Sequence, residues 1–594
     1  ISGTGALAKG AGGALTLSGP DTYQGGTTLS AGTLILANTA AAGTGLFTLT
    51  GGALSSTNQY VGSPGMGNFT QTGGTNNVSN ALYLGSASGA SGTYNLSGTG
   101  LLSVTHWEYI GSSGTGTFAQ SGGTNALNGT LVLGNSSGGI GTYNLSGTGT
   151  LSAAGGFVGN FGTGSFTQSG GTNTISQILY LGYSSGGSGT YNLNGGVLCL
   201  PQLIQGAGSA TFNFGGGVLQ AKAPLSTTLP MILTGGGNAT IDTNGQTVAL
   251  WGVLSGPGNL VKADTGTLTL AASNTYSGNT LISGGTLALG NSAALQQSTL
   301  DTSGGGSLSF GSLGSATLGG LTGPGTITLA NTASTAVALS VGNNNNSTTF
   351  SGTLQGAGSL AKVGTGTLTV TGNNTYSGGT SISAGGLVVA GSLGNTAVTV
   401  GGGATLGGTG SIAGTVVVLG GNTAGTQGAV NLADGMPGTL TLSDPNPADT
   451  VLTLGGLTVG NPSAFTFEVG TIADRIQVAA GKVVVNPGGS LINIIALSGF
   501  GPGTYDLLDF PGGQASGLGY LSLATTSVNG YPIYLQSTPT AEQLVVAVPE
   551  PSTLALLASG AVGILGFARP WRKRARRRVP APASPDSRPT TGGR

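Results

Sequence analysis

Most of the chain is a succession of short runs in which apolar and polar residues alternate, separated by clusters of Gly, Ser, Thr and Asn. Runs such as 130–133 (TLVL) and 150–152 (TLS) have the two-residue period of a strand with one buried face, and the residues between them are typical of turns. Apolar residues keep helical spacing over the roughly 11 residues that a helix requires in one window alone, near the C-terminus. The body of the chain is therefore predicted to be all-β.

A longer period is superimposed on this alternation. From Val61 to Gly206 a glycine recurs about every two dozen residues, and an aromatic residue follows it after six to nine positions. The glycines are residues 62, 85, 111, 134, 159, 182 and 206, and the aromatic residues are Phe69, Tyr94, Phe118, Tyr143, Phe166, Tyr191 and Phe212. Phe opens segments like FTQTGGTN and Tyr opens segments like YNLSGTG, so the full period is two units. Such self-similarity predicts a solenoid whose units stack and whose aromatic residues form a ladder, either in the core or along one groove.

Composition favours a folded β-solenoid over two other repetitive classes. Glycine supplies 120 of the 594 residues, without the strict every-third spacing of collagen. Charged residues make up only 5% of the chain, whereas disordered chains carry much more charge, and the aliphatic content suffices for a core. We expect the glycines at corners that need positive φ, with Thr, Ser and Asn satisfying hydrogen bonds there.

The formal net charge of zero conceals two oppositely charged parts. Residues 1–548 contain six Lys and Arg against thirteen Asp and Glu, whereas residues 569–594 contain nine Lys and Arg against Asp586 alone. A charge-poor, mildly acidic body offers no basic stripe, so we expect no nucleic-acid partner.

The basic end belongs to a composite C-terminal segment. Pro549, Glu550 and Pro551 precede the apolar run 553–568, and seven cations follow it: Arg569, Arg572, Lys573, Arg574, Arg576, Arg577 and Arg578. The run is slightly shorter than the roughly 20 residues of a membrane-spanning helix, but Pro551 and Ser552 can extend it. By the positive-inside rule we expect one transmembrane helix in the inner membrane, with its cations in the cytoplasm and the repeat body on the far side. The alternative is a buried helix followed by a basic surface loop, although no other helix is predicted for it to pack against.

This order of motif, apolar run and cations resembles the PEP-CTERM sorting signal of bacteria that make exopolysaccharide, over about 30 residues. The resemblance implies that an exosortase-type processing enzyme cleaves near Pro549-Glu550-Pro551. A membrane-anchored precursor would then yield a mature protein at the cell surface or outside the cell. One departure is the Pro-, Ser- and Thr-rich tail 579–594, because family signals usually end soon after the cations. The tail is either inert or a sign of inefficient sorting, and the anchor is either cleaved or retained.

A second resemblance rests on three related segments. Leu260-Val261-Lys262 is followed by GTLTL and then by Asn274-Thr275-Tyr276-Ser277-Gly278, and the same order recurs at 360–378 and, more divergently, at 7–25. In all three the lysine precedes the tyrosine by fourteen residues. The segments resemble the autotransporter-associated β-strand repeat, also called the passenger-associated transport repeat, of secreted parallel β-helices. The resemblance implies a right-handed parallel β-helix, a surface location and no catalytic residues.

These features divide the chain into six parts. We expect a divergent β-strand repeat in 1–50, tandem aromatic and glycine units in 51–220, autotransporter-associated repeats in 221–421, a C-terminal β cap in 422–547, the sorting signal with its helix in 548–578 and the tail in 579–594. A solenoid needs an atypical last unit to cover its end. Within the cap, Arg475 beside Asp474 and Glu468 is expected to form a structural pair.

Candidate chemistry is sparse. His106, Trp107 and Glu108 form the most unusual tripeptide, because the sister unit has only small residues at 154–156 and is one residue shorter. An aromatic ring beside His and Glu could contact a sugar, and a local bulge is the simpler alternative.

Other signals argue against chemistry. Asp506 and Asp509 could suggest a glycosidase pair, but residues three apart in a strand point to opposite faces. One histidine and one cysteine leave no His-rich metal site and no disulfide framework, and Cys199 is expected to be a buried, unreactive thiol. The glycine string 215–217 is expected to be a corner, because no helix follows as in a phosphate loop. We therefore expect no catalytic residue, metal or cofactor.

Two classes of function remain. The first is a non-catalytic structural or adhesive surface protein, a stiff rod that presents Thr, Ser and Asn toward matrix polysaccharide or neighbouring cells. The second is a polysaccharide lyase or hydrolase on a β-helix scaffold, but such enzymes need charged residues on consecutive rungs, and units 61–220 contain Glu108 as their one carboxylate. The first class is favoured. Because Ile1 already lies within a repeat, we expect a longer precursor with an N-terminal export signal.

Overall fold

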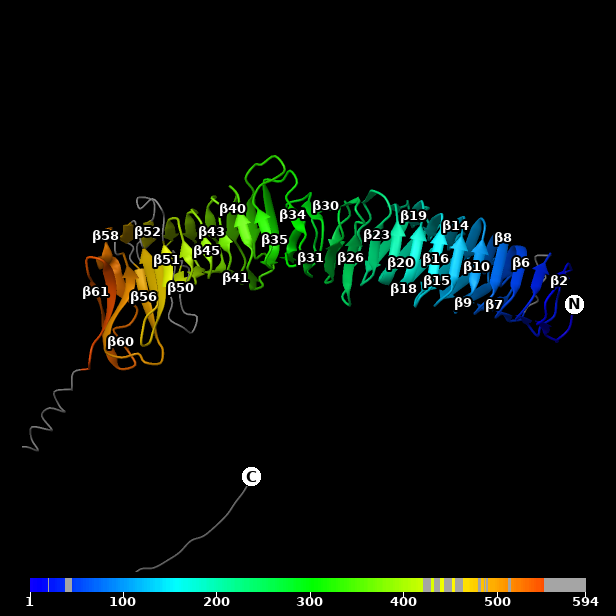
Figure 1. Cartoon of the computed structure of the whole chain (residues 1–594), viewed down its shortest axis with the longest axis horizontal. Coiled ribbons are helices and arrows are strands. Elements are labelled where there is room, and N and C mark those ends of the chain that lie inside the picture. The colour runs from blue at the N-terminus through cyan, green and yellow to red at the C-terminus, as the bar shows by residue number, and fades with distance from the viewer. Residues whose placement is uncertain are drawn as a thin grey trace, which may run out of the picture.

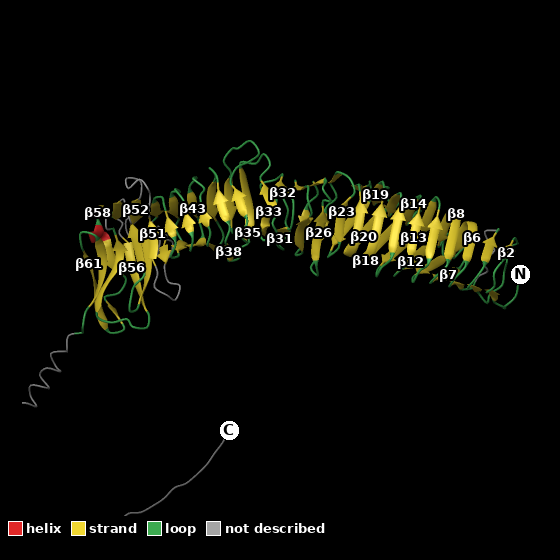
Figure 2. Cartoon of the chain, in the orientation of Figure 1, coloured by secondary structure: helices red, strands yellow, loops and turns green. Residues whose placement is uncertain are grey.

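The computed structural model of the chain is an elongated, gently curved rod of β-strands (Figure 1). It describes residues 1–19, 21–37, 45–419, 429–431, 439–442, 451–454, 463–478, 482–485, 487, 490–510 and 514–549. The one helical segment among these residues is the single 3₁₀ turn η1 (Leu518–Tyr520), drawn red in Figure 2. The prediction of an all-β body is confirmed for the described residues.

The strands wind into a parallel β-solenoid, as predicted, and the solenoid has about 19 turns. Each complete turn contributes up to three strands, and each strand pairs in register with the strands one turn before and one turn after it. The solenoid therefore has three faces, which we number in the order in which the chain visits them.

The first face consists of β1 (Leu7–Lys9), β3 (Thr27–Leu29), β5 (Phe47–Leu49), β7 (Met66–Gln71), β9 (Ser91–Leu96), β12 (Thr115–Gln120), β15 (Ile140–Leu145), the first parts of β18 (Thr163–Ile175) and β20 (Ser188–Leu200), β22 (Ser209–Phe214), β25 (Met231–Leu233) and β28 (Leu254–Ser255). It resumes at Leu295, the first residue of β33 (Leu295–Asp301), and continues in the first part of β35 (Ser315–Thr322), β37 (Ala338–Val341), β40 (Ser359–Lys362), β43 (Thr380–Ile382), β46 (Val398–Val400), β49 (Val416–Val418), β52 (Val451–Leu454), β55 (Lys482–Val485) and β58 (Gln514–Ser516).

The second face consists of β2 (Ala14–Leu17), β4 (Thr33–Leu36), the first parts of β6 (Ala53–Val61) and β8 (Thr75–Leu84), β10 (Leu101–Val104), β13 (Thr124–Leu127), β16 (Thr150–Ala153), the second parts of β18 and β20, β23 (Val218–Ala221), β26 (Asn238–Asp242), β29 (Asn259–Ala263), β31 (Thr280–Ile282), the second parts of β33 and β35, β38 (Thr348–Phe350), β41 (Thr367–Val370), β44 (Gly385–Val389), β47 (Ala404–Gly407), β50 (Ala429–Asn431), β53 (Ser463–Val469), β56 (Ser490–Ala496) and β59 (Leu521–Leu523).

The third face consists of the second parts of β6 and β8, β11 (Trp107–Ile110), β14 (Thr130–Leu133), β17 (Gly155–Val158), β19 (Ile178–Leu181), β21 (Gln202–Gln205), β24 (Leu225–Thr227), β27 (Thr247–Leu250), β30 (Thr267–Leu270), β32 (Thr286–Leu289), β34 (Ser307–Ser309), β36 (Thr326–Thr328), β39 (Thr353–Gln355), β42 (Asn373–Asn374), β45 (Ser392–Leu393), β48 (Ser411–Ile412), β51 (Thr439–Leu442), β54 (Arg475–Val478) and β57 (Gly503–Asp509).

The three lysine-containing repeats are not in phase with these faces. Lys9 lies on β1, whose register runs through β3 and β5 to Phe69 of β7, on the first face. Lys262 lies on β29, whose register runs through β31 to the second parts of β33 and β35, on the second face. Lys362 lies on β40, which pairs with β37 and through it with the first part of β35, on the first face. The second copy therefore begins one face later in the turn than the first and third copies do.

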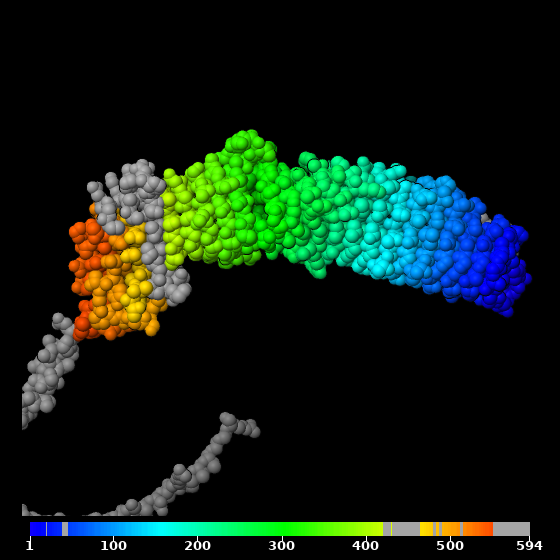
Figure 3. Space-filling view, in the orientation of Figure 1, coloured from blue at the N-terminus to red at the C-terminus, as the bar shows by residue number. Residues whose placement is uncertain are grey.

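Strand alternation places every second residue in one continuous core. In β12, for example, Gly116, Phe118 and Gln120 are buried, while the residues between them lie on the outer surface. The core runs along the interior from Leu17 to Val546 over the described residues. Figure 3 shows the narrow rod whose interior this core occupies.

The recurring glycines are required by the backbone at one corner of the solenoid. Residues 62, 85, 111, 134, 159 and 182 all have φ between 58° and 77°, which favours glycine. A Cβ at any of them would also lie 2.0–2.4 Å from a backbone carbonyl oxygen of another turn. Successive turns thus approach too closely for any side chain, and the predicted use of glycine at corners is confirmed.

The C-terminal end differs in topology. The described strands of 422–547 continue the three parallel faces as far as β59, and then β62 (Ala541–Val546) adds antiparallel to β57. β61 (Tyr531–Ser537) and β60 (Ser527–Val528) extend this antiparallel edge. Among the described residues no helix is long and apolar enough to span a membrane, and the predicted transmembrane segment 553–568 lies outside them.

Candidate functional site: aromatic stacks inside and outside the solenoid

The seven predicted aromatic residues stack in one column inside the solenoid, and Phe47 extends it by one turn. Neighbouring ring centroids are 4.5–5.4 Å apart with interplanar angles of 4–14°. None of these residues exposes more than 3% of its surface. Of the two locations predicted for the ladder, the core is the one observed, so these rings are closed to ligands.

Buried amides explain why the repeat has a period of two units. The hydroxyl of Tyr143 donates to Oε1 of Gln120 (2.5 Å) and accepts from Nδ2 of Asn125 (3.2 Å). Nε2 of Gln120 in turn donates to the carbonyls of Gly123 (3.2 Å) and Thr150 (2.9 Å). The turn that carries Phe therefore supplies Gln and Asn, and the next turn supplies the tyrosine hydroxyl that they hold.

The same arrangement surrounds the other two tyrosines of the ladder. Tyr94 is held by Gln71 and Asn76, and Tyr191 by Gln168 and Asn173. Burial raises the pKa of all three hydroxyls above the ordinary value, so they remain protonated donors.

Glu108 lies in the core beside the middle amide pair. Its Oε2 accepts from Nδ2 of Asn125 (2.9 Å), while its Oε1 is buried and has no hydrogen-bond partner. Burial raises the pKa of this carboxyl to about 7, against the opposing effect of the Asn125 hydrogen bond. Register places Gln59 and Gly156 at the equivalent inward positions two turns before and two turns after.

The candidate triplet is divided by the wall of the solenoid. Trp107 points outward and exposes 41% of its surface, whereas Glu108 points inward and is fully buried. His106 is exposed in the corner that precedes β11, and the extra residue of this unit lies in that corner. β11 pairs with β8 and β14 without a register shift, so there is no bulge, and the triplet does not converge on one ligand.

A second aromatic column, not predicted from the sequence, lies on the outer surface of the third face. Tyr60, Tyr83 and Tyr109 stack at 4.7 and 5.1 Å, and Phe157 and Tyr180 stack at 5.3 Å. Val132 occupies the register position between the two groups. We call these five aromatic residues, with Trp107 and Tyr183 beside them, the outer aromatic stripe.

The two remaining members of the stripe, Trp107 and Tyr183, lie on either side of the stacked column. Trp107 stacks on Tyr109 at 5.7 Å, and Tyr183 meets Phe157 and Tyr180 edge-on at 4.7 and 5.0 Å. The sequence did contain a signal for the column, since its members lie two residues before glycines 62, 85, 111, 159 and 182.

The lysines of the three repeats bind backbone carbonyls. Nζ of Lys262 donates to the carbonyls of Ala263 (2.9 Å) and Asp264 (2.7 Å) in its own corner and of Gly284 (3.1 Å) in the next turn. Lys362 makes the same bonds, and Lys9 reaches the carbonyls of Ala11 and Ala31. Lys262 and Lys362 are fully buried, and burial lowers their pKa. Each of these side chains therefore fastens two successive corners together.

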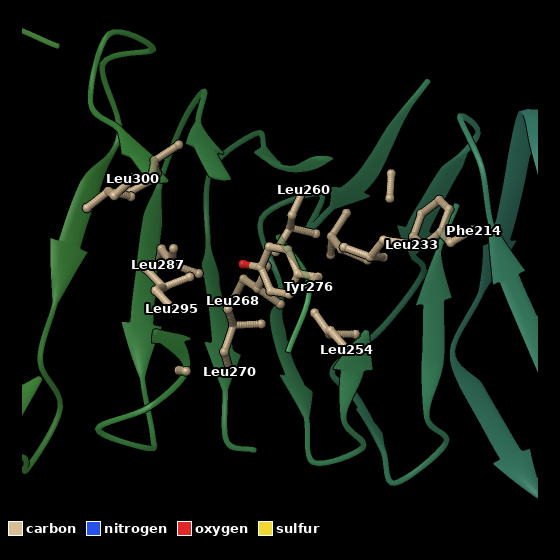
Figure 4. Packing of buried hydrophobic residues seen from close by; sticks show 14 of the residues in the cluster. Phe214, Leu233, Leu254, Leu260, Leu268, Leu270, Tyr276, Leu287, Leu295 and Leu300 are labelled. Atoms are coloured by element: carbon tan, nitrogen blue, oxygen red, sulfur yellow. The ribbon is translucent and has the colours of Figure 1, made fainter. Parts of the chain in front are cut away.

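The tyrosine and asparagine of the repeat are also structural. The hydroxyl of Tyr276 is hydrogen-bonded to Oγ1 of Thr280 (2.6 Å), which contacts Oγ of Ser298 (2.7 Å) one turn later. Asn274 accepts from the amide of Leu254 and donates to the carbonyl of Ala294, so it bridges three turns. Figure 4 shows Tyr276 packed among leucines of the core.

The remaining candidates give no converging site. Arg475 pairs with Asp509 (3.5 Å), while the carboxylate of Asp474 accepts from the backbone amide of Glu468 (2.7 Å). Asp506 is instead bound by a glutamine, Gln543, at 2.7 Å, so the two aspartates of β57 have separate partners. The prediction of a buried Cys199 needs correction, because the residue occupies an outward position of β20 and is partly exposed.

The sorting motif falls at the limit of the described residues. Pro549 is exposed at the end of the chain that the structure describes. Glu550, Pro551 and the seven membrane-flanking cations lie outside the described residues.

Comparison with family models matches both predicted resemblances. The passenger-associated-transport-repeat model matches residues 9–36, 260–289 and 360–389. The model of the PEP-CTERM protein-sorting motif matches residues 547–573. No curated protein matches the chain. The chain thus contains three passenger-associated-transport repeats within a parallel β-solenoid and carries a PEP-CTERM protein-sorting motif at 547–573.

Proposed function

We propose that the chain is a non-catalytic structural or adhesive protein of the cell surface, associated with the extracellular polysaccharide matrix. The sorting motif indicates an exported protein that is sorted to the cell envelope. The observation that carries the non-catalytic part is the distribution of charge. Between Asp21 and Lys222 the sequence has one charged residue, Glu108, and its carboxylate faces the core.

This distribution disfavours catalysis by the repeat region. Glycosidases use paired carboxylates, and general acid–base catalysis needs a titratable group within reach of the substrate. Over the described part of residues 22–221, the outer surface carries no Asp, Glu, Lys or Arg, so the exposed His106 has no second charged group beside it there. What this surface does offer is hydroxyl, amide and aromatic groups at regular spacing, which suits binding and display.

The proposal includes a route to the surface. The apolar run 553–568 would engage the inner membrane as a helix with its cations cytoplasmic, and an exosortase-type enzyme would cleave near Pro549-Glu550-Pro551. The match to the sorting motif supports this processing. A right-handed sense of winding, as in other proteins with this repeat, belongs to the same proposal.

Two measurements test the proposal. Mass spectrometry of surface material should find peptides of the solenoid and none from 579–594, and mature protein that retains the tail would show a permanent anchor instead. Incubation of the full chain with polysaccharides should release no reducing ends or unsaturated products. Turnover of any of them would refute the non-catalytic role.

A further inference from the structure

We propose that the outer aromatic stripe is a docking site for a neutral polysaccharide chain, centred on Trp107 and Tyr183. This inference rests on the proposed function and deepens it, because it names the surface that holds the matrix. The site lies on strands β11 to β19 of the third face, whose positions are fixed by ladders of parallel pairing on both sides.

The stacking geometry determines which rings can meet a ligand. Within the column the rings of Tyr60, Tyr83 and Tyr109 cover one another's faces, because they are nearly parallel at 4.7–5.1 Å. They present mainly edges and hydroxyls to solvent. Trp107 and Tyr183 are different, since each stands beside the column and exposes 41% and 42% of its surface, respectively.

The neighbours of Trp107 leave room beside it. Register places Thr130 and then Gly155 next to Trp107 on the two following turns, so no bulky side chain stands there. Tyr183 lies at the corner after β19, three turns beyond β11, and its ring crosses those of Phe157 and Tyr180 at 71° and 75°. Three turns of about 4.8 Å separate the two exposed rings by about 14 Å along the axis. Trp107 lies at the start of its strand and Tyr183 beyond the end of β19, so a polymer that crosses the column obliquely along the rod can contact both.

Charge identifies the class of occupant. A nucleic acid or an acidic polysaccharide would require lysines or arginines, and a basic peptide would require carboxylates. The described outer surface around the stripe has none of these groups over residues 22–221. A neutral polymer carries no charges that such a surface would have to pair, and the surface has none that the polymer would have to pair.

The polar groups beside the stripe are neutral donors and acceptors. Asn160 donates to Asn135 (3.0 Å) and Ser113 donates to Ser136 (3.4 Å) at the same corner that carries Tyr183. Sugar rings combine apolar C–H faces with neutral hydroxyls, and aromatic side chains with nearby amides and hydroxyls match both features. This combination favours a polysaccharide over a purely apolar partner.

The test is retention of the purified full chain by defined polysaccharides. The neutral probes are cellulose, a soluble β-1,3-glucan and mannan, and the anionic probes are alginate and hyaluronate. A non-glycosidic detergent keeps the C-terminal segment in solution without competing for the site. Trp107→Ala and Tyr183→Ala are compared with Trp251→Ala, which removes a tryptophan that is 58% exposed elsewhere on the rod. Circular dichroism melts confirm that all variants fold.

We expect at least one neutral probe to retain the wild type, with little change between low and high salt. Trp107→Ala and Tyr183→Ala should each weaken retention at least tenfold, and Trp251→Ala should not. The proposal is overturned if no neutral probe retains the chain, if only anionic probes do, or if Trp251→Ala causes the same loss. It is also overturned if stripe variants change only self-association in sedimentation, because the occupant would then be a second copy. Failure of docking leaves the surface role intact, whereas turnover of a probe would refute the non-catalytic role alone.

Discussion

Glu108 makes the stability of the solenoid depend on pH in a direction opposite to that of most carboxylates. Its ordinary pKa of 4.5 rises to about 7 in the folded chain, because burial disfavours the charged form. The folded state therefore binds this proton more tightly than the unfolded state does. The contribution of Glu108 to stability is full below pH 4.5 and is lost as the pH rises through 7.

The magnitude follows from the difference between the two pKa values. At about 1.4 kcal/mol for each pH unit, the rise from 4.5 to about 7 corresponds to about 3 kcal/mol. In a solenoid this loss acts mainly on the affected turns and their neighbours, since each repeat contacts only the adjacent ones. The effect should therefore appear as local opening around β10 to β14.

The chain itself supplies the control variant. Gln59 occupies the position equivalent to Glu108 and accepts from Asn76 as Glu108 accepts from Asn125. Glu108→Gln should therefore fold with the same packing and lack the titration.

The assay is amide hydrogen exchange of the full chain at pH 5, 6, 7 and 8, corrected for the intrinsic exchange rate. Peptides that cover β10 to β14 should lose up to about 3 kcal/mol of protection between pH 5 and pH 8 in the wild type and much less in Glu108→Gln. The same pH dependence in both proteins would refute the reasoning. A gain of protection with rising pH in the wild type relative to the variant would also refute it.

Three further substitutions test the structural devices. Tyr143→Phe keeps the ring in the ladder but leaves Oε1 of Gln120 without its donor, so we expect a loss of about 1–3 kcal/mol in urea unfolding, smaller than the roughly 3–5 kcal/mol expected for Tyr143→Ala; no loss in Tyr143→Phe would mean that the hydroxyl is irrelevant. Lys262→Met leaves buried carbonyls without their donor and should lower the local unfolding free energy by about 1–3 kcal/mol. The exposed control Lys222→Met should change it by less than about 0.5 kcal/mol. Similar hydrogen exchange in both variants would show that Lys262 does not hold the two corners together. Gly111→Ala places a Cβ about 2.0 Å from a backbone carbonyl and requires positive φ, so its melting temperature should fall clearly, and an unchanged melt would show that the corner can relax.

The sequence was sufficient for the parts of the fold that depend on backbone geometry. The glycine period marked corners that no other residue can occupy, and the Phe and Tyr positions marked the interior column. The alternation rule failed where the core is polar. Gln120, Asn125 and Glu108 are polar and were not predicted to lie in the core, yet a ladder with a hydroxyl in every second turn needs amides inside to satisfy it.

The outer aromatic stripe was missed because the predicted ladder comprised only the aromatic residues that follow the glycines. Tyr83 and Tyr109 precede their glycines and gain burial from each other on the outside of the rod. The position two residues before a glycine marked the column but did not show on which side of the sheet its rings lie, because inward and outward positions differ by only one residue. Only the register between successive turns determines whether a given side chain faces the core or the solvent.

The change of phase between the repeats bears on how such a rod can vary in length. Two copies start on the first face and one copy starts on the second, yet the same lysine contacts form in each case. The repeat thus specifies a segment long enough for one complete turn of the solenoid, and this turn can begin at any corner. We expect insertion or loss of a complete circuit at any corner to lengthen or shorten the rod by one strand spacing, about 4.8 Å, and to leave its cross-section unchanged.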